Sequence, residues 1–226
     1  MYETRGFEPP SPTSTPHDLF THTAYEDDRY DLCHETAHRF VRRTDDRERL
    51  VYLDGSCLDQ TDRANVSTRR AGCAFVFKPE PYSPQEGIVG FRLEAEGPTG
   101  RAYPQTSNRA ELRAAIAVLQ YLPWNEEGCD TLVLATDSEY VVLGITQRIA
   151  VWMERGWTTS ARTAVKNRDL WECLLAEVNK FASRGMEVVF WRIPREWNTE
   201  ADAAARQAAS THPFVSELAE LNGGWV

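Results

Sequence analysis

Runs of apolar residues along the chain predict five strands. Turn-forming and polar residues separate the first three runs, which is typical of strands joined by short connections. The fourth run is continuously apolar, as in a strand buried on both faces, and Pro194 ends the fifth. The predicted strands cover residues 50–53, 71–77, 87–95, 131–136 and 187–193.

Between and after these strands the apolar positions repeat with a helical period. In the helix predicted over residues 108–122, for example, the apolar positions 112, 115, 116 and 119 share one face. Further helices are predicted over residues 138–153, 169–181 and 199–210, and the tail from Thr211 has room for one more. This order of elements predicts an α/β fold in which helices cover both faces of a five-stranded mixed sheet.

The chain divides into three parts by composition. Residues 1–49 form a highly charged N-terminal arm. Its first part, residues 1–27, interleaves four prolines with Ser and Thr, and we expect it to be largely disordered. Residues 50–210 hold every predicted strand and form the predicted main domain, and residues 211–226 are a C-terminal tail.

The cysteines and histidines leave two interpretations of the arm open. The chain has 5 cysteines, an odd and widely spaced set that fits reduced thiols better than a disulfide framework. Cys33, His34 and His38 lie close together but lack a second Cys/His pair at the spacing of a zinc finger. The cluster is therefore either a metal site or part of a solvated or docking segment.

The charge and hydropathy of the chain exclude some classes of protein. A net charge of −9 and a pI near 5.1 argue against binding polyanions by bulk charge, although a local patch or a bound metal can offset the total. No apolar stretch reaches the ~20 residues that span a bilayer. The acidic, proline-rich N-terminus does not resemble a secretory signal. We therefore expect a cytoplasmic or nuclear protein without membrane contact.

Four carboxylates stand out because each lies where an apolar run meets a turn or the start of a helix. They are Asp54, Glu111, Asp137 and Asp202. Four acids in this order predict a pocket that concentrates negative charge and needs a cation to fill it. Hard divalent cations such as Mg²⁺ prefer oxygen ligands, and two of them can clamp the attacking and leaving oxygens of a phosphoryl transfer.

Each acid also has a purely structural interpretation when it is taken alone. Asp54 precedes a glycine, as in a common turn pair, and Asn108 with Glu111 has the spacing of a capping box. Asp137 can cap the next helix, and Asp202 can complement a helix dipole. Their order and spacing together favour a shared metal site.

The chain resembles the type 1 ribonuclease H family over about residues 50–210. Four motifs in the family's order carry the resemblance, and a stretch similar to the family's substrate-contacting handle lies between the last two. The motifs are Tyr52-Leu53-Asp54-Gly55-Ser56, Thr106-Ser107-Asn108-Arg109-Ala110-Glu111-Leu112, Ala135-Thr136-Asp137-Ser138-Glu139-Tyr140-Val141 and Asn198-Thr199-Glu200-Ala201-Asp202. The handle-like stretch contains Arg155-Gly156-Trp157 and Val165-Lys166-Asn167-Arg168-Asp169-Leu170-Trp171.

The resemblance implies a ribonuclease H-like fold and an endonuclease that hydrolyses the RNA strand of RNA–DNA hybrids. It implies two Mg²⁺ ions, with Mn²⁺ as a substitute, and products with a 3′-hydroxyl and a 5′-phosphate. The implied catalytic residues and metal ligands are Asp54, Glu111, Asp137 and Asp202, with Asp54 bridging both ions. The implied partner is an RNA–DNA hybrid, and we expect a monomer without assigning protein partners.

The resemblance also implies contacts to substrate. Asn108 matches a residue that contacts the hybrid in the minor groove, where the 2′-hydroxyl distinguishes RNA from DNA. Thr106 and Ser107 match positions near the substrate backbone. Asn198 matches an asparagine of the loop before the last carboxylate, and Trp157 and Lys166 belong to the handle. The implied substrate-binding residues are Thr106, Ser107, Asn108, Asn198, Trp157 and Lys166.

The chain departs from the family at the proton shuttle. The family usually has a histidine four residues after a tryptophan, and counting from Trp191 gives Arg195. Histidine exchanges protons near neutral pH, whereas arginine does not. We therefore expect Arg195 to hold the scissile phosphate or to help product release, with surface pairing to Glu196 or Glu200 as the structural alternative. Because losing a proton shuttle typically costs about 10²–10⁴-fold, a slower or differently tuned enzyme is predicted.

Two further departures bear on substrate binding. Residues 148–168 carry five basic side chains and one acidic one, which is modest for a handle and predicts weak, less salt-dependent binding. The insert after Asp54 is long, and its arginines Arg63, Arg69 and Arg70 either solvate a loop or reach substrate. The competing function is a degenerate ribonuclease H-like module that binds nucleic acid or a protein partner with little or no cleavage.

Overall fold

Seven strands form one mixed sheet. The structure is a computed structural model that describes residues 4–26, 36–59, 69–78, 87–221 and 223. Within these residues the strands are β1 (Phe20–Glu26), β2 (Thr36–Arg42), β3 (Asp45–Leu58), β4 (Arg70–Val76), β5 (Ile88–Arg92), β6 (Thr131–Thr136) and β7 (Glu187–Arg192).

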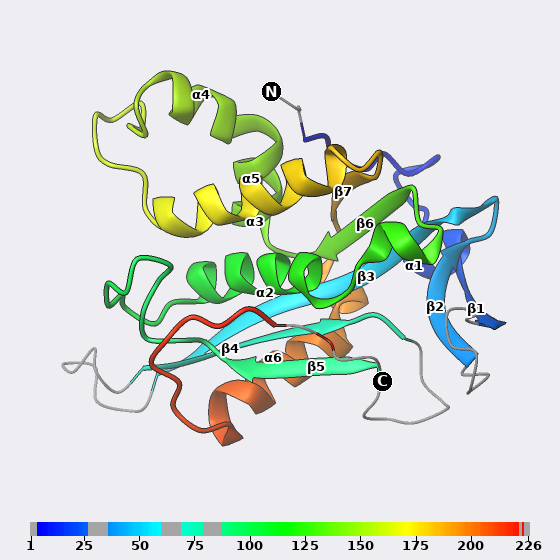
Figure 1. Cartoon of the computed structure of the whole chain (residues 1–226), viewed down its shortest axis with the longest axis horizontal. Coiled ribbons are helices and arrows are strands. Elements are labelled where there is room, and N and C mark those ends of the chain that lie inside the picture. The colour runs from blue at the N-terminus through cyan, green and yellow to red at the C-terminus, as the bar shows by residue number, and fades with distance from the viewer. Residues whose placement is uncertain (1–3, 27–35, 60–68, 79–86, 222, 224–226) are drawn as a thin grey trace.

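The long strand β3 organises the sheet (Figure 1). On one side it pairs in parallel with β6, and β6 pairs in parallel with β7. On the other side the second half of β3 pairs with β4, which pairs with β5, and both pairings are antiparallel. The first part of β3 pairs with β2, the second strand of the antiparallel β1–β2 hairpin. Strand β3, which carries Asp54, and strand β6, which precedes Asp137, are therefore neighbours at the centre of the sheet.

Helices cover both faces of the sheet. Helices α2 and α5 pack over one face, and α6 packs over the other against β3, β4 and β5 (Figure 1). The segment after β6 runs from α3 through one π-helical turn, residues 144–148, into α4. The helices are α1 (Pro16–Leu19), α2 (Ser107–Tyr121), α3 (Glu139–Leu143), α4 (Ile149–Glu154), α5 (Arg168–Ala182) and α6 (Thr199–Thr211).

Two glycines of the sheet let helices approach closely enough to fix the layers. A Cβ on Gly55 of β3 would lie 2.1 Å from the backbone nitrogen of Glu111 in α2. A Cβ on Gly72 of β4 would lie 2.3 Å from the backbone nitrogen of Ala209 in α6. Because no side chain fits at either point, the two helices pack directly against the sheet from opposite faces.

The predicted α/β architecture is found, with two differences. The five predicted strands correspond to β3 through β7, but the sheet has seven strands because the N-terminal arm adds the β1–β2 hairpin. The prediction of disorder over residues 1–27 is wrong for residues 4–26, which contain α1 and β1. The composition that suggested disorder overlooked two buried or packed aromatics, Phe7 and Phe20, which contact Trp191 of β7.

The N-terminal segment also covers the edge of β7. Gly6 forms a parallel bridge with Phe190, and the amide of Phe7 donates to the Phe190 carbonyl at 2.8 Å. Arg5 forms an ion pair with Glu187 on the same strand. The edge strand of the sheet is therefore paired by the segment that comes first in the sequence.

The remaining predictions concern the tail and the cysteines. Residues 212–221 form no helix, so the additional helix considered for the tail is not found in these residues. The four described cysteines are unpaired, and Cys73 and Cys129 are buried. Cys33 and His34 lie outside the described residues. Across the described residues no helix is long and apolar enough to cross a bilayer.

Candidate active site

Asp54 lies at the centre of the site, on β3. Asp54 is buried, with 6% of its surface exposed to solvent. Burial is the main cause that raises the pKa of this carboxyl to about 7, and the nearby Asp137, Glu111 and Asp202 add to it. The amide of Gly55 acts in the opposite direction by donating to the carboxylate. The sequence-predicted acids are therefore close enough to repel one another.

The register of the parallel strands brings Asp137 beside Asp54. Tyr52 of β3 pairs with Ala135 of β6, so the two acids follow the paired residues by two positions on neighbouring strands. Asn198 holds this pair of strands together. Its Nδ2 donates to the Asp137 Oδ1 at 2.9 Å and to the Leu53 carbonyl at 3.0 Å.

Glu111 reaches the site from the first turns of α2. The close approach at Gly55 brings the helix backbone at Glu111 onto the strand that carries Asp54. The Ser138 hydroxyl donates to Glu111 Oε2 at 2.5 Å and also accepts from the Val141 amide as the N-cap of α3. Burial raises the pKa of Glu111, while this hydrogen bond opposes the rise.

Asp202 of α6 is engaged by two guanidinium groups. Arg195 donates to its Oδ1 at 2.7 Å, and Arg206 lies 3.1 Å from its Oδ2. The structural alternative for Arg195 was a surface pairing with Glu196 or Glu200, and Arg195 instead pairs with Asp202, the fourth acid of the site. Asp202 raises the pKa of Arg195, which stays a cation. The Arg195 side chain is 65% exposed and so is open to a ligand.

The donor set fits hard divalent cations, although its side chains are not arranged as a finished metal site. Among the described residues, no three Asp, Glu, His or Cys side chains converge to hold an ion. The reason lies in their partners, because Ser138, Asn198 and Arg195 each engage a different carboxylate. Asp54 remains buried among like charges. A hard divalent cation, which takes oxygen ligands, would relieve this repulsion.

The predicted substrate residues fall into two groups. Thr106, Ser107 and Asn108 lie at the start of α2, beside Glu111, where Asn108 is exposed. Thr106 is the N-cap of α2 and accepts from the Arg109 amide at 3.3 Å, a role that the capping-box interpretation had given to Asn108. Asn198, by contrast, is 1% exposed. Its predicted contact with substrate stays a prediction.

Trp157 and Lys166 lie on the handle-like loop between α4 and α5. Trp157 has a left-handed backbone with φ of 61°, packs partly against the core, and lies under the Arg168 guanidinium at 5.3 Å. Lys166 is exposed, and its carbonyl accepts from the Tyr140 hydroxyl at 3.3 Å. The base of the loop is therefore tied to α3, which directly follows Asp137.

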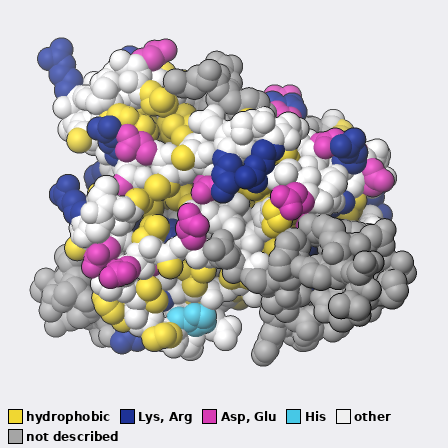
Figure 2. All heavy atoms as spheres, in the orientation of Figure 1, with side chains coloured by type: hydrophobic (Ala, Val, Ile, Leu, Met, Phe, Trp, Pro, Cys, Tyr) yellow, Lys and Arg dark blue, Asp and Glu magenta, His cyan; other side chains and the backbone are white. Residues whose placement is uncertain are grey.

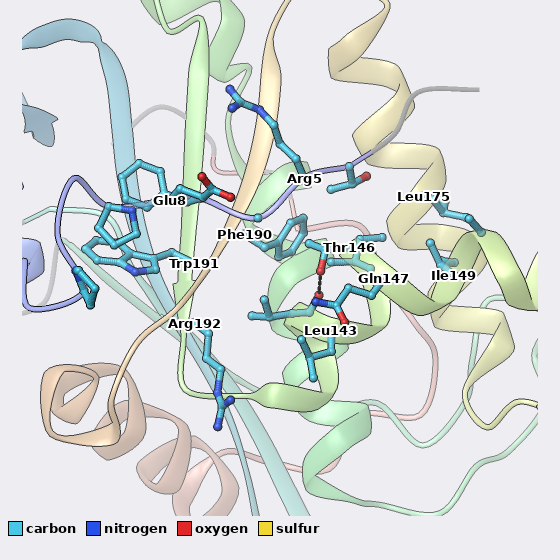
Figure 3. A pocket seen from close by; sticks show the side chains of 18 of the residues that line it. Arg5, Glu8, Leu143, Thr146, Gln147, Ile149, Leu175, Phe190, Trp191 and Arg192 are labelled. Carbon is cyan, nitrogen blue, oxygen red and sulfur yellow. Dashed lines mark hydrogen bonds between the residues drawn. The ribbon is translucent and has the colours of Figure 1, made fainter.

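A large cavity lies elsewhere, between the N-terminal segment and the helical segment after β6 (Figure 3). Its volume is about 1130 Å³, and Arg5, Phe190 and Gln147 are among its lining residues. None of the four acids lines it, so the catalytic candidates do not belong to this cavity. In Figure 2, basic and acidic side chains are interspersed on the face shown.

Sequence reasoning missed three supporting residues. Ser138 and Arg206 directly engage Glu111 and Asp202. Tyr140 accepts from Asn167 and Trp171 as well as donating to the handle. Ser138 and Tyr140 follow Asp137 closely, so their nearness to the site was visible in the sequence. Their hydrogen-bond partners come from other elements and were not.

A family model and two known proteins of similar sequence point to the same family. The family model for RNase H matches residues 46–210. Ribonuclease H from Klebsiella pneumoniae subsp. pneumoniae is 42% identical over 171 residues, 76% of this chain and 94% of that protein. Ribonuclease H from Idiomarina loihiensis is 38% identical over 172 residues, 74% of this chain and 91% of that protein.

Solved structures agree at the level of the fold. The crystal structure of LC9-RNase H1, described as a type 1 RNase H with the type 2 active-site motif, is 25% identical, covers 73% of this chain and 72% of its own, and has a TM-score of 0.50. The solution structure of the PFV RNase H domain is 18% identical, with coverages of 73% and 95% and a TM-score of 0.50. The predicted ribonuclease H-like fold is confirmed, and the chain belongs to the ribonuclease H family of nucleases.

Proposed function

We propose that this chain is a Mg²⁺-dependent endonuclease that hydrolyses the RNA strand of RNA–DNA hybrids. The observation that carries the proposal is the buried Asp54, whose pKa is raised to about 7 by burial and by three further acids. A protein keeps such a cluster at a stability cost, and bound divalent metal would offset that cost. The family relationship supplies the reaction class, and Mn²⁺ is the expected substitute.

The proposed metal ligands are Asp54, Glu111, Asp137 and Asp202. When bound, two ions would supply an activated water and charge stabilisation at the leaving oxygen. The protein's own groups do the positioning. Ser138 orients Glu111, and Asn198 orients Asp137 and fixes it relative to the Leu53 carbonyl. We therefore assign Asn198 a positioning role in place of a substrate contact.

Arg195 is proposed to exchange partners during the reaction. In the free protein it neutralises Asp202. A bound phosphate offers a second anion to the same exposed guanidinium, so Arg195 is placed to hold the scissile phosphate. Because an arginine does not exchange protons near neutral pH, proton transfer to the leaving group would fall to water.

Substrate recognition is proposed for the exposed start of α2 and for the handle. Asn108 would contact the minor groove of the hybrid, with Thr106 and Ser107 near the substrate backbone. Trp157 and Lys166 would contact the hybrid from the handle, where Lys166 is exposed. The five basic side chains of residues 148–168, set against one acidic side chain, support few phosphate contacts and hence modest affinity.

The test is cleavage of an end-labelled RNA–DNA hybrid in Mg²⁺ and in Mn²⁺. Cleavage confined to the RNA strand is expected, and Asp54→Asn should abolish it. Arg195→Ala should lower kcat, and Arg195→His should raise the rate above that of the natural chain if the missing proton shuttle limits it. Hybrid binding without cleavage by any variant would contradict the proposal and favour a nucleic-acid-binding module.

A further inference from the structure

The β1–β2 hairpin carries chemistry that the proposed function does not use. Its strands pair over seven positions, from Phe20 opposite Arg42 to Glu26 opposite Thr36. Only Phe40, Val41 and Arg42 of β2 pair with β3. The outer part of the hairpin therefore has no third strand from the main sheet, and two-stranded hairpins are at best marginally stable in water.

Two histidines, His22 and His38, face each other where the hairpin leaves the main sheet. His22 is opposite Phe40 and His38 is opposite Ala24, so the two histidines are diagonal neighbours on the same face of the hairpin. His22 Nε2 and His38 Nδ1 are 2.8 Å apart, and the site is partly buried. The ring centroids are 5.0 Å apart with an interplanar angle of 23°. Since this separation is long for rings in face-to-face contact, the rings meet edge to edge through the two nitrogens.

We propose that His22 and His38 form a binding site for a transition-metal ion of the zinc class. Neutral imidazole is a common ligand of Zn²⁺, Ni²⁺ and Cu²⁺. Two nitrogens at tetrahedral positions around zinc, each about 2.0–2.1 Å from the ion, lie roughly 3.3 Å apart. The two rings therefore need to separate by only about 0.5 Å to accept an ion between the nitrogens that already face each other.

The described residues supply two ligands to this site, the imidazoles of His22 and His38. Among the described side chains no third His, Cys, Asp or Glu completes a cluster. An ion held by the two imidazoles would cross-link β1 to β2 reversibly.

Zinc titration by calorimetry on the full chain tests this site. Excess Mg²⁺ is present throughout, and the Asp54→Asn background is measured in parallel, so that the carboxylate site does not contribute. We expect one zinc per chain, lost in the double variant His22→Ala with His38→Ala. The matched control combines His17→Ala with His212→Ala, two histidines outside the pair, and should retain the full stoichiometry.

A second variant separates metal binding from the integrity of the hairpin. Replacing both histidines by glutamine keeps hydrogen-bonding side chains but removes the imidazole ligands, so zinc should again be lost while the circular dichroism spectrum stays unchanged. Substoichiometric Cu²⁺ should broaden the amide NMR signals of β1 and β2 before others. Unchanged zinc stoichiometry in either double variant, or no zinc site in the natural chain, would overturn the proposal and leave a hydrogen-bonded histidine pair. The readout is binding, so it is independent of hybrid cleavage.

Discussion

At the scale of single residues, the site depends on how each carboxylate is held. Three acids have protein partners: Glu111 has Ser138, Asp137 has Asn198, and Asp202 has Arg195. Asp54 has the amide of Gly55 but is the acid most affected by its neighbours, and burial with like charge raises its pKa to about 7. It is therefore the residue at which a cation would relieve the most repulsion.

This pKa predicts how stability depends on pH in the absence of metal. A carboxyl whose pKa is higher in the folded than in the unfolded state makes the folded protein bind more protons, so stability falls as pH rises from about 4 to about 7. The loss has an upper limit of about 4 kcal/mol. Asp54→Asn removes the titrating group, so its melting temperature in chelator should exceed that of the natural chain above pH 7.

The difference in melting temperature between the two proteins should shrink toward pH 4, where Asp54 is protonated in the folded chain and about half protonated in the unfolded chain. Thermal unfolding followed by circular dichroism from pH 4 to pH 9 measures it. An Asp54→Asn variant that is equally or less stable at pH 8 would mean that the acid cluster is not under electrostatic strain.

Sequence reasoning found the four acids but not the way they are held. Their positions at the ends of apolar runs were visible in the sequence. The partners were not, because Asn198 and Asp137 are 61 positions apart and Ser138 and Glu111 are 27 apart. Asn198 was therefore predicted only to meet substrate, and its burial and its hydrogen bond to Asp137 were not foreseen.

At the scale of elements, one close approach between α2 and β3 assembles the site. A Cβ on Gly55 would lie 2.1 Å from the Glu111 nitrogen and 2.4 Å from the Ala110 carbonyl carbon. Both neighbours are backbone atoms, so the helix as a whole would have to move away. The distance between Asp54 and Glu111 is thus set by the absence of a side chain between them.

Gly55→Ala should therefore damage both stability and activity. We expect a loss of about 1–3 kcal/mol in the free energy of unfolding, as for other overpacked sites, and a fall in hybrid cleavage at saturating Mg²⁺. The matched control is Gly90→Ala on β5, where the added Cβ would lie 3.5 Å from the nearest atom, an ordinary contact. Urea denaturation measures the stability of both variants, and the cleavage assay measures their activity. Equal stability and equal activity of the two variants would refute this role for Gly55.

The elements themselves were predicted more securely than their caps. The periodicity that predicted one helix over residues 138–153 did not reveal the π-helical turn at residues 144–148. The structural alternatives named Asn108 and Asp137 as helix caps, but Thr106 and Ser138 are the N-caps of α2 and α3. In both cases a chemically equivalent cap lay within two residues, so local sequence could not choose between them. The structural choice leaves Asp137 available to the site.

At the scale of the whole molecule, the N-terminal segment belongs to the fold. It pairs with the edge of β7 through Gly6 and places Phe7 against Trp191, with ring centroids 4.8 Å apart. Composition could not predict this, because prolines and hydroxyl residues surround the few aromatic residues that decide the packing. Strand β7, which this segment pairs with, leads directly into the loop that carries Arg195 and Asn198.

Phe7→Ala should therefore destabilise the protein, by about 1–2 kcal/mol for the lost apolar contact. Phe214 provides the matched control, since it is 73% exposed and its replacement by alanine should change stability by less than about 0.5 kcal/mol. Chemical denaturation of both variants measures the difference. Equal stability of the two variants would show that residues 4–8 contribute little to the fold.

The most direct test of the account is calorimetric titration of Mg²⁺ into the natural chain and into Asp54→Asn. If the four acids are the metal site, the natural chain binds Mg²⁺ more tightly as pH rises through 7, because Asp54 must lose its proton first. The variant should bind at least tenfold more weakly and without this pH dependence. Equal binding by the two proteins at pH 8 would place the metal elsewhere and contradict the proposed active site.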